Sequence, residues 1–154
     1  MKEQRQKLLC VLQNAYVLAQ NVEQLLRRFG DQHARHVRLA TPVQSFLAQT
    51  IDEQRVLCEC LHRIDDFKQT PRSFANEGRE SSREPAGQSE DDALQDLDHL
   101  HALIREGIDL YHSGIETAES SGFFETRFVC EGILTQKSLM TEWLSLHTPS
   151  QTQP

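Results

Sequence analysis

A chain of 154 residues has the length of one domain and can bury most of the apolar surface that its unfolded form would expose. Its composition is 38% hydrophobic and 25% charged, with only 5 prolines and 7 glycines, which argues against an all-β protein because such chains need a turn about every ten residues. The net charge of −7 and the scattered lysines and arginines disfavour direct binding to DNA, since duplex-binding proteins usually carry a basic face.

Apolar runs in the chain are short. None reaches the ~18 residues that can span a membrane. The charged N-terminus is followed by an amphipathic segment instead of the apolar stretch of a signal peptide. We therefore expect a cytoplasmic protein without a membrane segment.

The first predicted helix covers residues 3–36. Apolar residues recur at steps of three and four from Leu8 to Phe29, which is the spacing of one helix face. Gly30 either ends this helix as a C-cap or lies within it, in which case the helix continues to about residue 36.

The second predicted helix covers residues 42–68, with Thr41 as the N-cap and Pro42 at the first helical position. Its apolar stripe is interrupted by Thr50, Glu53 and Gln54. This polar break is consistent with a water-lined interior or with a face that contacts a partner subunit. We favour the partner face.

Residues 70–91 are rich in serine, glutamate and arginine and contain two prolines and two glycines. A mobile link of this length is uncommon inside a compact domain unless it serves a purpose. A four-helix bundle with a long crossover between its second and third helices needs such a link.

Two further helices are predicted at 92–119 and 123–147, separated by a short break at Ser120–Gly122, and residues 148–154 read as a disordered tail. Four helices of similar length, one long link and two short ones predict an all-α, four-helix bundle over residues 1–147.

The second half of the chain carries a family resemblance. Residues 118–126 read AESSGFFET, Trp143 lies near the end of the last helix, and a second patch covers residues 57–76. These features resemble the Dps branch of the ferritin-like proteins, whose third helix ends in Ala-Glu shortly before a glycine. Phe123 departs from the pattern, because the family usually has an aspartate there.

The resemblance implies a ferritin-like bundle that handles iron. Fe(II) would be oxidised by peroxide or oxygen, and the ferric product would be stored inside an oligomeric shell as a protection against stress. The family's ferroxidase site is shared across a two-fold dimer interface. It uses one histidine from the first helix and a histidine, two aspartates and a glutamate from the second.

The family's site residues are replaced in this chain. The five positions fall on Asp31, Val43, Leu47, Cys58 and His62, and none keeps the family's residue. Asp31, Cys58 and His62 can all ligate, so they form a candidate divergent metal site, of a kind that suits a softer metal than carboxylates do. In the alternative interpretation, the apolar replacements simply pack at the dimer face.

Other candidate ligands have less support. A second register starts from His36 and places Asp52 on one acidic position, but both read as surface residues. His101 occupies the apolar stripe of the third helix, which is more typical of a core histidine than of a ligand. The motifs of nucleophilic catalysis and of phosphate binding are absent from the sequence, so an enzyme activity would be metal-based.

The four cysteines, Cys10, Cys58, Cys60 and Cys130, show no C-x-x-C spacing. We expect reduced and mostly buried thiols.

The leading hypothesis is a Dps-like homo-oligomer, either a dimer or a closed shell, that binds and stores iron and has ferroxidase activity only if a rebuilt metal site exists. The rival hypothesis is a metal-free, non-catalytic ferritin-like scaffold or partner-binding protein, which the apolar Val43 and Leu47 favour. A third class is a helical adaptor unrelated to ferritins. The sequence does not fix the oligomer size, the oxidant or the role of the link.

Overall fold

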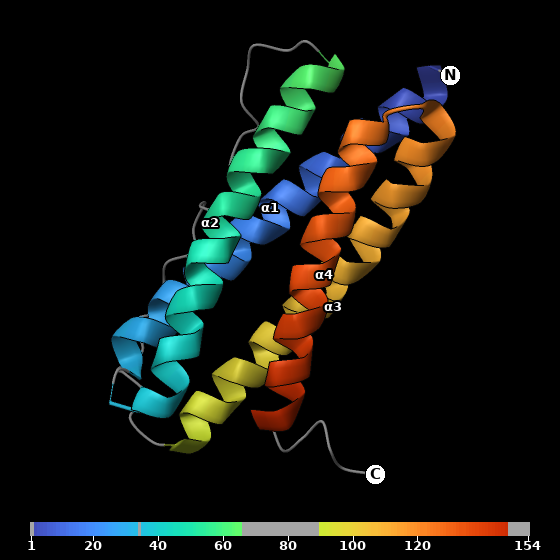
Figure 1. Cartoon of the computed structure of the whole chain (residues 1–154). Coiled ribbons are helices and arrows are strands. Elements are labelled where there is room, and N and C mark those ends of the chain that lie inside the picture. Colours follow the sequence, from blue (N-terminus) through green and yellow to red (C-terminus); the bar gives the residue numbers. More distant parts are fainter. Residues whose placement is uncertain (1, 34, 66–89, 148–154) are drawn as a thin grey trace.

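The computed structural model describes residues 2–33, 35–65 and 90–147, and these form four α-helices without a strand (Figure 1). The helices are α1 (Lys2–Gln32), α2 (Val37–Asp65), α3 (Glu90–Ser121) and α4 (Phe124–His147). The prediction of an all-α, four-helix bundle is confirmed. The expected link at 70–91 lies outside the described residues except for 90 and 91, which belong to α3, and the expected tail at 148–154 lies outside them entirely.

The order and direction of the helices are those of a ferritin-like bundle. Neighbours α1 and α2 are antiparallel, as are α3 and α4, whereas α2 and α3 run in the same direction (Figure 1). The end of α2 and the start of α3 therefore lie at opposite ends of the bundle. A chain with this arrangement needs a long crossover between its two helix pairs.

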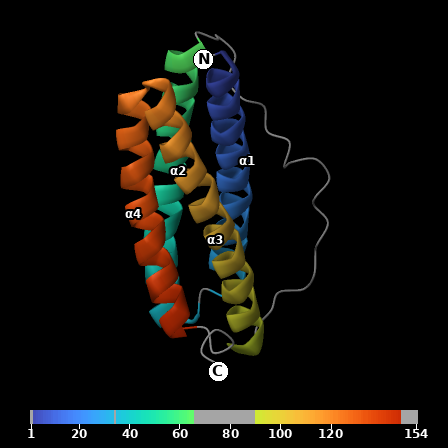
Figure 2. The same ribbon diagram turned by 90° about the vertical axis from the view of Figure 1, so that its right-hand side faces the viewer.

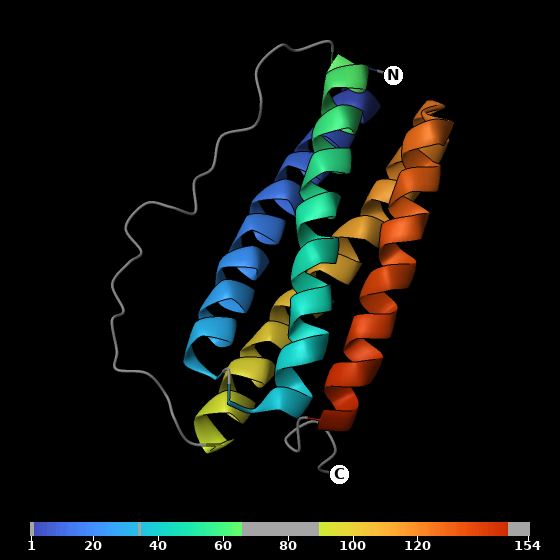
Figure 3. The same ribbon diagram turned by 60° about the vertical axis from the view of Figure 1, so that its left-hand side comes forward.

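Packing between the helices is uneven. The closely packed pairs are α1 with α2, α1 with α3, and α3 with α4, whereas α2 and α4 approach each other at few positions. Figure 2 shows α1 and α4 on opposite sides of the bundle. Figure 3 shows α2 and α4 next to each other but farther apart than the closely packed pair α3 and α4. We call the boundary between α2 and α4 the α2–α4 seam.

The apolar core consists of two clusters, one toward each end of the bundle, and every helix contributes to both. The first cluster contains Leu8, Leu57 and Tyr111, and the second contains Phe29, Val43 and Leu144. Burying a side chain of this size stabilises the folded state by roughly 1.5–3 kcal/mol, so the clusters supply the main driving force for helix association. None of the described helices offers a stretch long and apolar enough to cross a membrane.

Of the two alternatives for Gly30, the structure shows the glycine within α1, which continues through it and ends at Gln32 instead of about residue 36. The expected start of the second helix at Pro42 was wrong, because α2 begins at Val37. The backbone oxygen of His36 accepts hydrogen bonds from the N–H groups of residues 39 and 40, at 2.9 Å each, so His36 starts the helix instead of Thr41. Pro42 is tolerated five residues into α2, near the helix start, where its missing N–H removes one helical hydrogen bond.

A tight turn at Gly122 joins α3 to α4, as expected. Gly122 has a φ of 83°, and the N–H of Phe123 donates to the carbonyl oxygen of Ala118 at 2.9 Å. This pair of features is a Schellman cap, in which a left-handed residue, usually glycine, ends the helix. The predicted break is narrower than expected, because α3 includes Ser120 and Ser121.

Gly122 and Gly30 are expected to respond to alanine with opposite signs. An added Cβ would meet open space at both positions, so only the backbone conformation differs. Gly122→Ala should lower the free energy of unfolding by about 1 kcal/mol, because an alanine is strained in the left-handed region. Gly30→Ala should raise it by up to about 1 kcal/mol, because alanine is the better helix former. Denaturant unfolding of both variants is the measurement. A shift in the same direction for both would contradict either the left-handed conformation of Gly122 or the helical conformation of Gly30.

Candidate functional site

A polar layer lies between the two apolar clusters, and its centre is formed by Glu53 of α2, Tyr111 of α3 and Lys137 of α4. Their exposed fractions are only 3%, 1% and 4%. The Tyr111 hydroxyl donates a hydrogen bond to Oε2 of Glu53, and the Lys137 ammonium donates one to Oε1, each at 2.5 Å. Both oxygens of the buried carboxylate therefore have a partner.

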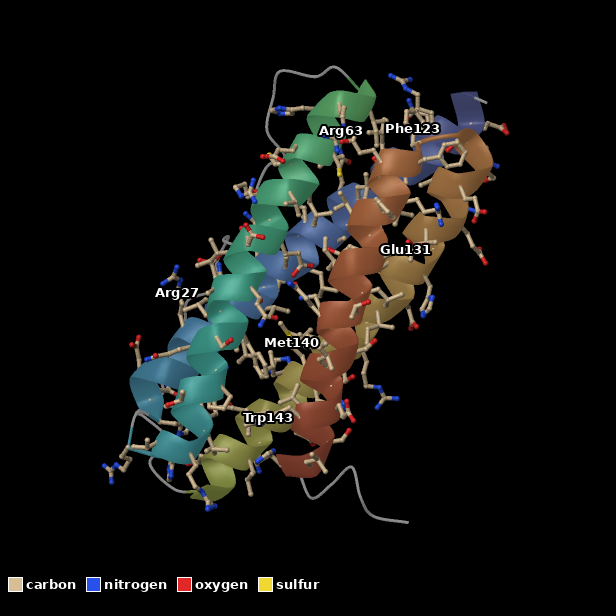
Figure 4. All side chains as sticks on the ribbon, in the orientation of Figure 1. Arg27, Arg63, Phe123, Glu131, Met140 and Trp143 are labelled. Carbon is tan, nitrogen blue, oxygen red and sulfur yellow. The ribbon has the colours of Figure 1, made fainter. Side chains whose placement is uncertain are left out.

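Helical spacing places these polar groups inside the bundle. Glu53 follows the buried Thr50 by three residues and precedes the buried Leu57 by four, so it stays on the inner face of α2. Lys137 follows the buried Ile133 by four residues and precedes the buried Met140 by three, so it stays on the inner face of α4. Met140 extends into the interior between α4 and α2 (Figure 4).

The polar break in α2 therefore faces the interior, and the favoured interpretation of a partner-subunit face was wrong. The reason is a counter-charge 84 residues away in sequence, which the pattern of α2 alone does not reveal. Thr50 donates to the carbonyl oxygen of Phe46 at 2.8 Å, and the Gln54 amide donates to Oε1 of Glu23 at 2.7 Å. The break is internally hydrogen-bonded.

A small cavity of about 10 Å³ adjoins the polar layer and is lined mostly by α1 and α3, with one residue each from α2 and α4. Its lining includes Ala19, Glu53, Gly107 and Lys137. This volume is near the minimum that holds one water molecule. The interior of the bundle is thus packed and polar at this level, with little space for solvent.

The electrostatics of the layer favour a charged pair with a neutral tyrosine. Burial, followed by the negative charge of Glu53, raises the pKa of Tyr111 well above its usual value, so the phenol stays protonated and acts as a donor. Taking two charges out of water costs several kcal/mol per ion, and only close pairing and further hydrogen bonds offset that cost. The contacts of Glu53 with Lys137 and Tyr111 provide both.

The layer does not fit a di-iron centre. Such centres in ferritin-like bundles need a glutamate from each of two helices and a Glu-x-x-His motif from each of the other two. Glu53 is the only buried carboxylate among the described residues, and the residues three positions after Glu53 and Lys137 are Val56 and Met140. An ammonium in hydrogen-bond contact with that carboxylate would also repel a divalent cation. The described part of the chain contains no group of three or more His, Cys, Asp or Glu side chains arranged to hold a metal.

The predicted metal ligands are not brought together within one chain. Asp31 is exposed at the end of α1, whereas the half-buried Cys58 and the exposed His62 lie toward the end of α2. Because α1 and α2 are antiparallel, Asp31 lies at the opposite end of the bundle from His62 (Figure 1). Cys58 and His62 do share a face of α2, one turn apart. A site completed by another subunit stays a prediction.

The remaining candidates occupy different settings. Val43 is buried and Leu47 packs against the same apolar cluster. Asp52 is exposed and paired with Arg55 at 2.8 Å. His101 is buried on α3, and its pKa is lowered by burial and then by the charge of Arg105, so the neutral ring is favoured.

One interaction of a histidine was not expected from the sequence. His33, which follows α1, is fully buried, and its Nε2 lies 2.8 Å from Oδ2 of Asp96 on α3. The contact joins the end of α1 to the beginning of α3. A histidine just past the last periodic residue of a helix gives no sequence signal for such a partner.

All four cysteines are free thiols, and they differ in access to solvent. Cys60 and Cys130 are buried, Cys58 is half-buried, and Cys10 is exposed, so the expectation of mostly buried thiols holds for two of them. Burial raises the pKa of Cys130 to about 12, with a smaller contribution from Cys60.

Alkylation is expected to separate these thiols. At pH 8 a thiol of pKa about 12 has roughly one part in ten thousand as the reactive thiolate. Iodoacetamide should therefore modify Cys10 rapidly in the folded protein and leave Cys130 unmodified, as read by peptide mass spectrometry. All four should react in concentrated guanidinium chloride. Equal labelling of Cys10 and Cys130 in the folded state would contradict the burial.

Breaking the buried pair should be costly, whereas removing the whole polar layer should not. Lys137→Met leaves Glu53 buried without its counter-charge and should lower the free energy of unfolding by about 3–5 kcal/mol. The triple variant Glu53→Leu, Tyr111→Phe, Lys137→Met should recover most of that loss, because it leaves no unpaired polar group. Denaturant unfolding measures both variants. A single variant as stable as the wild type would contradict the pairing.

Comparison with known proteins places the chain in a family. A family model described as a domain of unknown function, DUF892, matches residues 3–154. A crystal structure of a protein from Xanthomonas campestris pv. campestris has the same fold, with a TM-score of 0.76 and 21% sequence identity over 96% of this chain and 92% of that chain. No curated protein matches. The chain belongs to the DUF892 family, and its fold is a ferritin-like four-helix bundle.

Proposed function

We propose that this protein is a metal-independent, non-catalytic bundle that acts through its surface, as an oligomeric scaffold or a partner-binding protein. The observation that carries the proposal is the contact of Glu53 with Lys137 at the centre of the bundle. Bundles of this class that bind two metal ions collect carboxylates and histidines at this level. Here a lysine ammonium supplies the positive charge instead.

The surroundings of the pair support the same proposal. Val56 and Met140 stand where the histidines of two Glu-x-x-His motifs would be, and neither can ligate a hard cation. The carboxylate is also engaged on its second oxygen by Tyr111. A divalent ion would have to displace both donors and would find one carboxylate.

Iron binding at a site shared by two subunits is the second candidate function. The arrangement of Cys58 and His62 on one face of α2 favours it, because a second chain could add further ligands there. The resemblance to Dps proteins would then imply ferroxidase activity and iron storage for stress protection. This function needs a dimer that uses α2, and ligands from the partner chain.

The central lysine is expected to decide whether the bundle binds metal. The wild-type protein should co-elute with no iron in size exclusion coupled to elemental analysis, and it should oxidise Fe(II) no faster than buffer does. The variant Val56→His, Lys137→Glu, Met140→His gives α2 and α4 one Glu-x-x-His motif each. Its melting temperature should rise by several degrees with Fe(II) or Zn(II), because a ligand that binds only the folded state stabilises it.

Two outcomes would count against the proposal. Stoichiometric iron in the wild-type protein would overturn metal independence. If Cys58→Ser with His62→Gln then removed that iron, the shared site on α2 would be the correct function. The pair Gln44→Ala with Arg55→Gln is the matched control, because both residues are exposed on the same helix and neither is a candidate ligand.

A further inference from the structure

The outer face of α4 carries a row of exposed apolar side chains. Phe124, Phe128, Leu139 and Leu146 are 58%, 69%, 62% and 77% exposed, and among the described residues the only other exposed large hydrophobic residues are Val37 and Ile51, on α2. Scattered exposed apolar residues are normal on a protein surface, but an apolar patch that follows one helix marks an interaction site. We call these four residues the α4 stripe.

Helical geometry places the α4 stripe on one line. At 100° per residue its members fall within an arc of about 60°. The buried residues of α4, which include Cys130, Ile133 and Met140, lie on the opposite side of the helix. The helix therefore carries apolar side chains on two faces, and among the described residues only the inner face is covered by other helices.

We propose that the α4 stripe binds the α4 stripe of a second copy of this chain, antiparallel, about a two-fold axis at Thr135. Phe124 precedes Thr135 by as many residues as Leu146 follows it, so Phe124 meets Leu146 of the partner subunit. Phe128 likewise meets the aliphatic part of the partner subunit's Glu142. An interface of this kind is isologous, because the same patch serves both copies.

The centre of the stripe permits close approach. Thr135 lies within this arc and Gly132 lies about 20° outside it, and an added Cβ at Gly132 would meet nothing within 4 Å. Small residues at the crossing point let two helices pack with an interaxial distance of about 8 Å, the short end of the usual range of about 8–10 Å. The largest side chains stand toward the two ends of the stripe.

Charges beside the stripe also match a second copy. Glu142 lies at one edge of the stripe and Arg127 about 60° beyond that edge, seven and eight residues from Thr135 on either side. Arg127 is paired with Glu131 of its own helix at 2.8 Å, so a contact with a second copy would extend this ion pair. In an antiparallel two-fold pair each flank faces its own counterpart, so Arg127 faces Glu142 of the partner subunit, and the contact occurs twice. An unrelated partner would need no such symmetry in the sequence of α4.

The size of the surface predicts a weak dimer. A helix of 24 residues is about 36 Å long, so two paired helices provide an interface near the lower end of the range for specific complexes. We expect a dissociation constant on the order of micromolar and a monomer–dimer equilibrium. The dimer rests on the proposed scaffold function only for its biological purpose. Its existence is tested independently, because self-association and metal content are separate measurements.

Sedimentation velocity over a range of roughly 1 to 100 µM tests the surface. The wild-type protein should shift from monomer to dimer with concentration, and the variant Phe128→Ser, Leu139→Ser should raise the dissociation constant at least tenfold. Val37→Ser is the matched control, since Val37 is 66% exposed but lies on α2, and it should leave the equilibrium unchanged. Circular dichroism should give the same helix content for all three proteins.

Cross-linking tests the position of the axis. In a Cys10→Ser background, Thr135→Cys places a thiol on the two-fold axis, where it meets its own copy. Diamide, as the two-electron oxidant, should then convert the two thiols into a disulfide and give a covalent dimer. Gln136→Cys, which is one residue along and about 100° around the helix, should give several-fold less dimer.

The proposal is overturned by a monomer throughout the concentration range, or by a dimer that the stripe variant leaves intact. Equal cross-linking at residues 135 and 136 would overturn the antiparallel axis at Thr135. Iron in a wild-type protein that still dimerises through the stripe would contradict the proposed function but not the dimer. An iron-free protein that stays monomeric would contradict the dimer but not the proposed function.

Discussion

The contact of Glu53 with Lys137 is the interaction on which the rest of the structure depends. It spans the α2–α4 seam, where the two helices otherwise approach each other at few positions. The seam is also crossed near one end by Arg63 and Glu125, at 3.7 Å, and near the other end by the edge contact of Phe46 with Trp143. Arg63, Met140 and Trp143 mark this line in Figure 4. Only the central contact is buried and charged, so sliding α2 past α4 by one turn, about 5.4 Å, would leave two unpaired ions in the core.

The same contact changes what a ferritin-like bundle can do. A metal centre joins the helices by ligands, and its strength depends on the supply and the oxidation state of the metal. A lysine that is part of the chain provides a permanent counter-charge and removes that dependence. The features that carry the Dps resemblance concern the fold instead of the chemistry. In the segment AESSG, the Ser121 hydroxyl donates to the carbonyl oxygen of Thr117 at 2.6 Å and Gly122 takes the left-handed position, so this motif ends a helix. Such a motif ends the helix whether or not the bundle holds a metal.

The sequence predicted the number of helices, their order and the turn at Gly122, because periodicity and cap residues are local signals. It misplaced the start of α2, because Thr41–Pro42 has the pattern of a helix start while the backbone oxygen of His36 performs that role. It also missed the polar layer, since a polar residue on one helix does not reveal its partner on another. One signal was available: Lys137 lies on the apolar stripe of α4, between Ile133 and Met140, where a charge needs a buried partner. The positions of Asp31, Cys58 and His62 came from a family register, which assigns residues to helices without showing which ends of antiparallel helices meet.

The weak seam inside the molecule and the apolar stripe outside it have a common explanation. A helix in a four-helix bundle normally packs against two neighbours, and α4 packs closely against α3 alone. The inner face of α4 is covered because side chains such as Lys137 and Trp143 reach across the seam toward α2. The outer face has no neighbour among the described residues, yet its sequence is that of a helix with a second apolar face. A helix of this kind is stable in a small domain only if water tolerates the exposed row or another helix covers it. A second α4 would supply the neighbour that α2 does not, and the bundle would then be complete only as a pair.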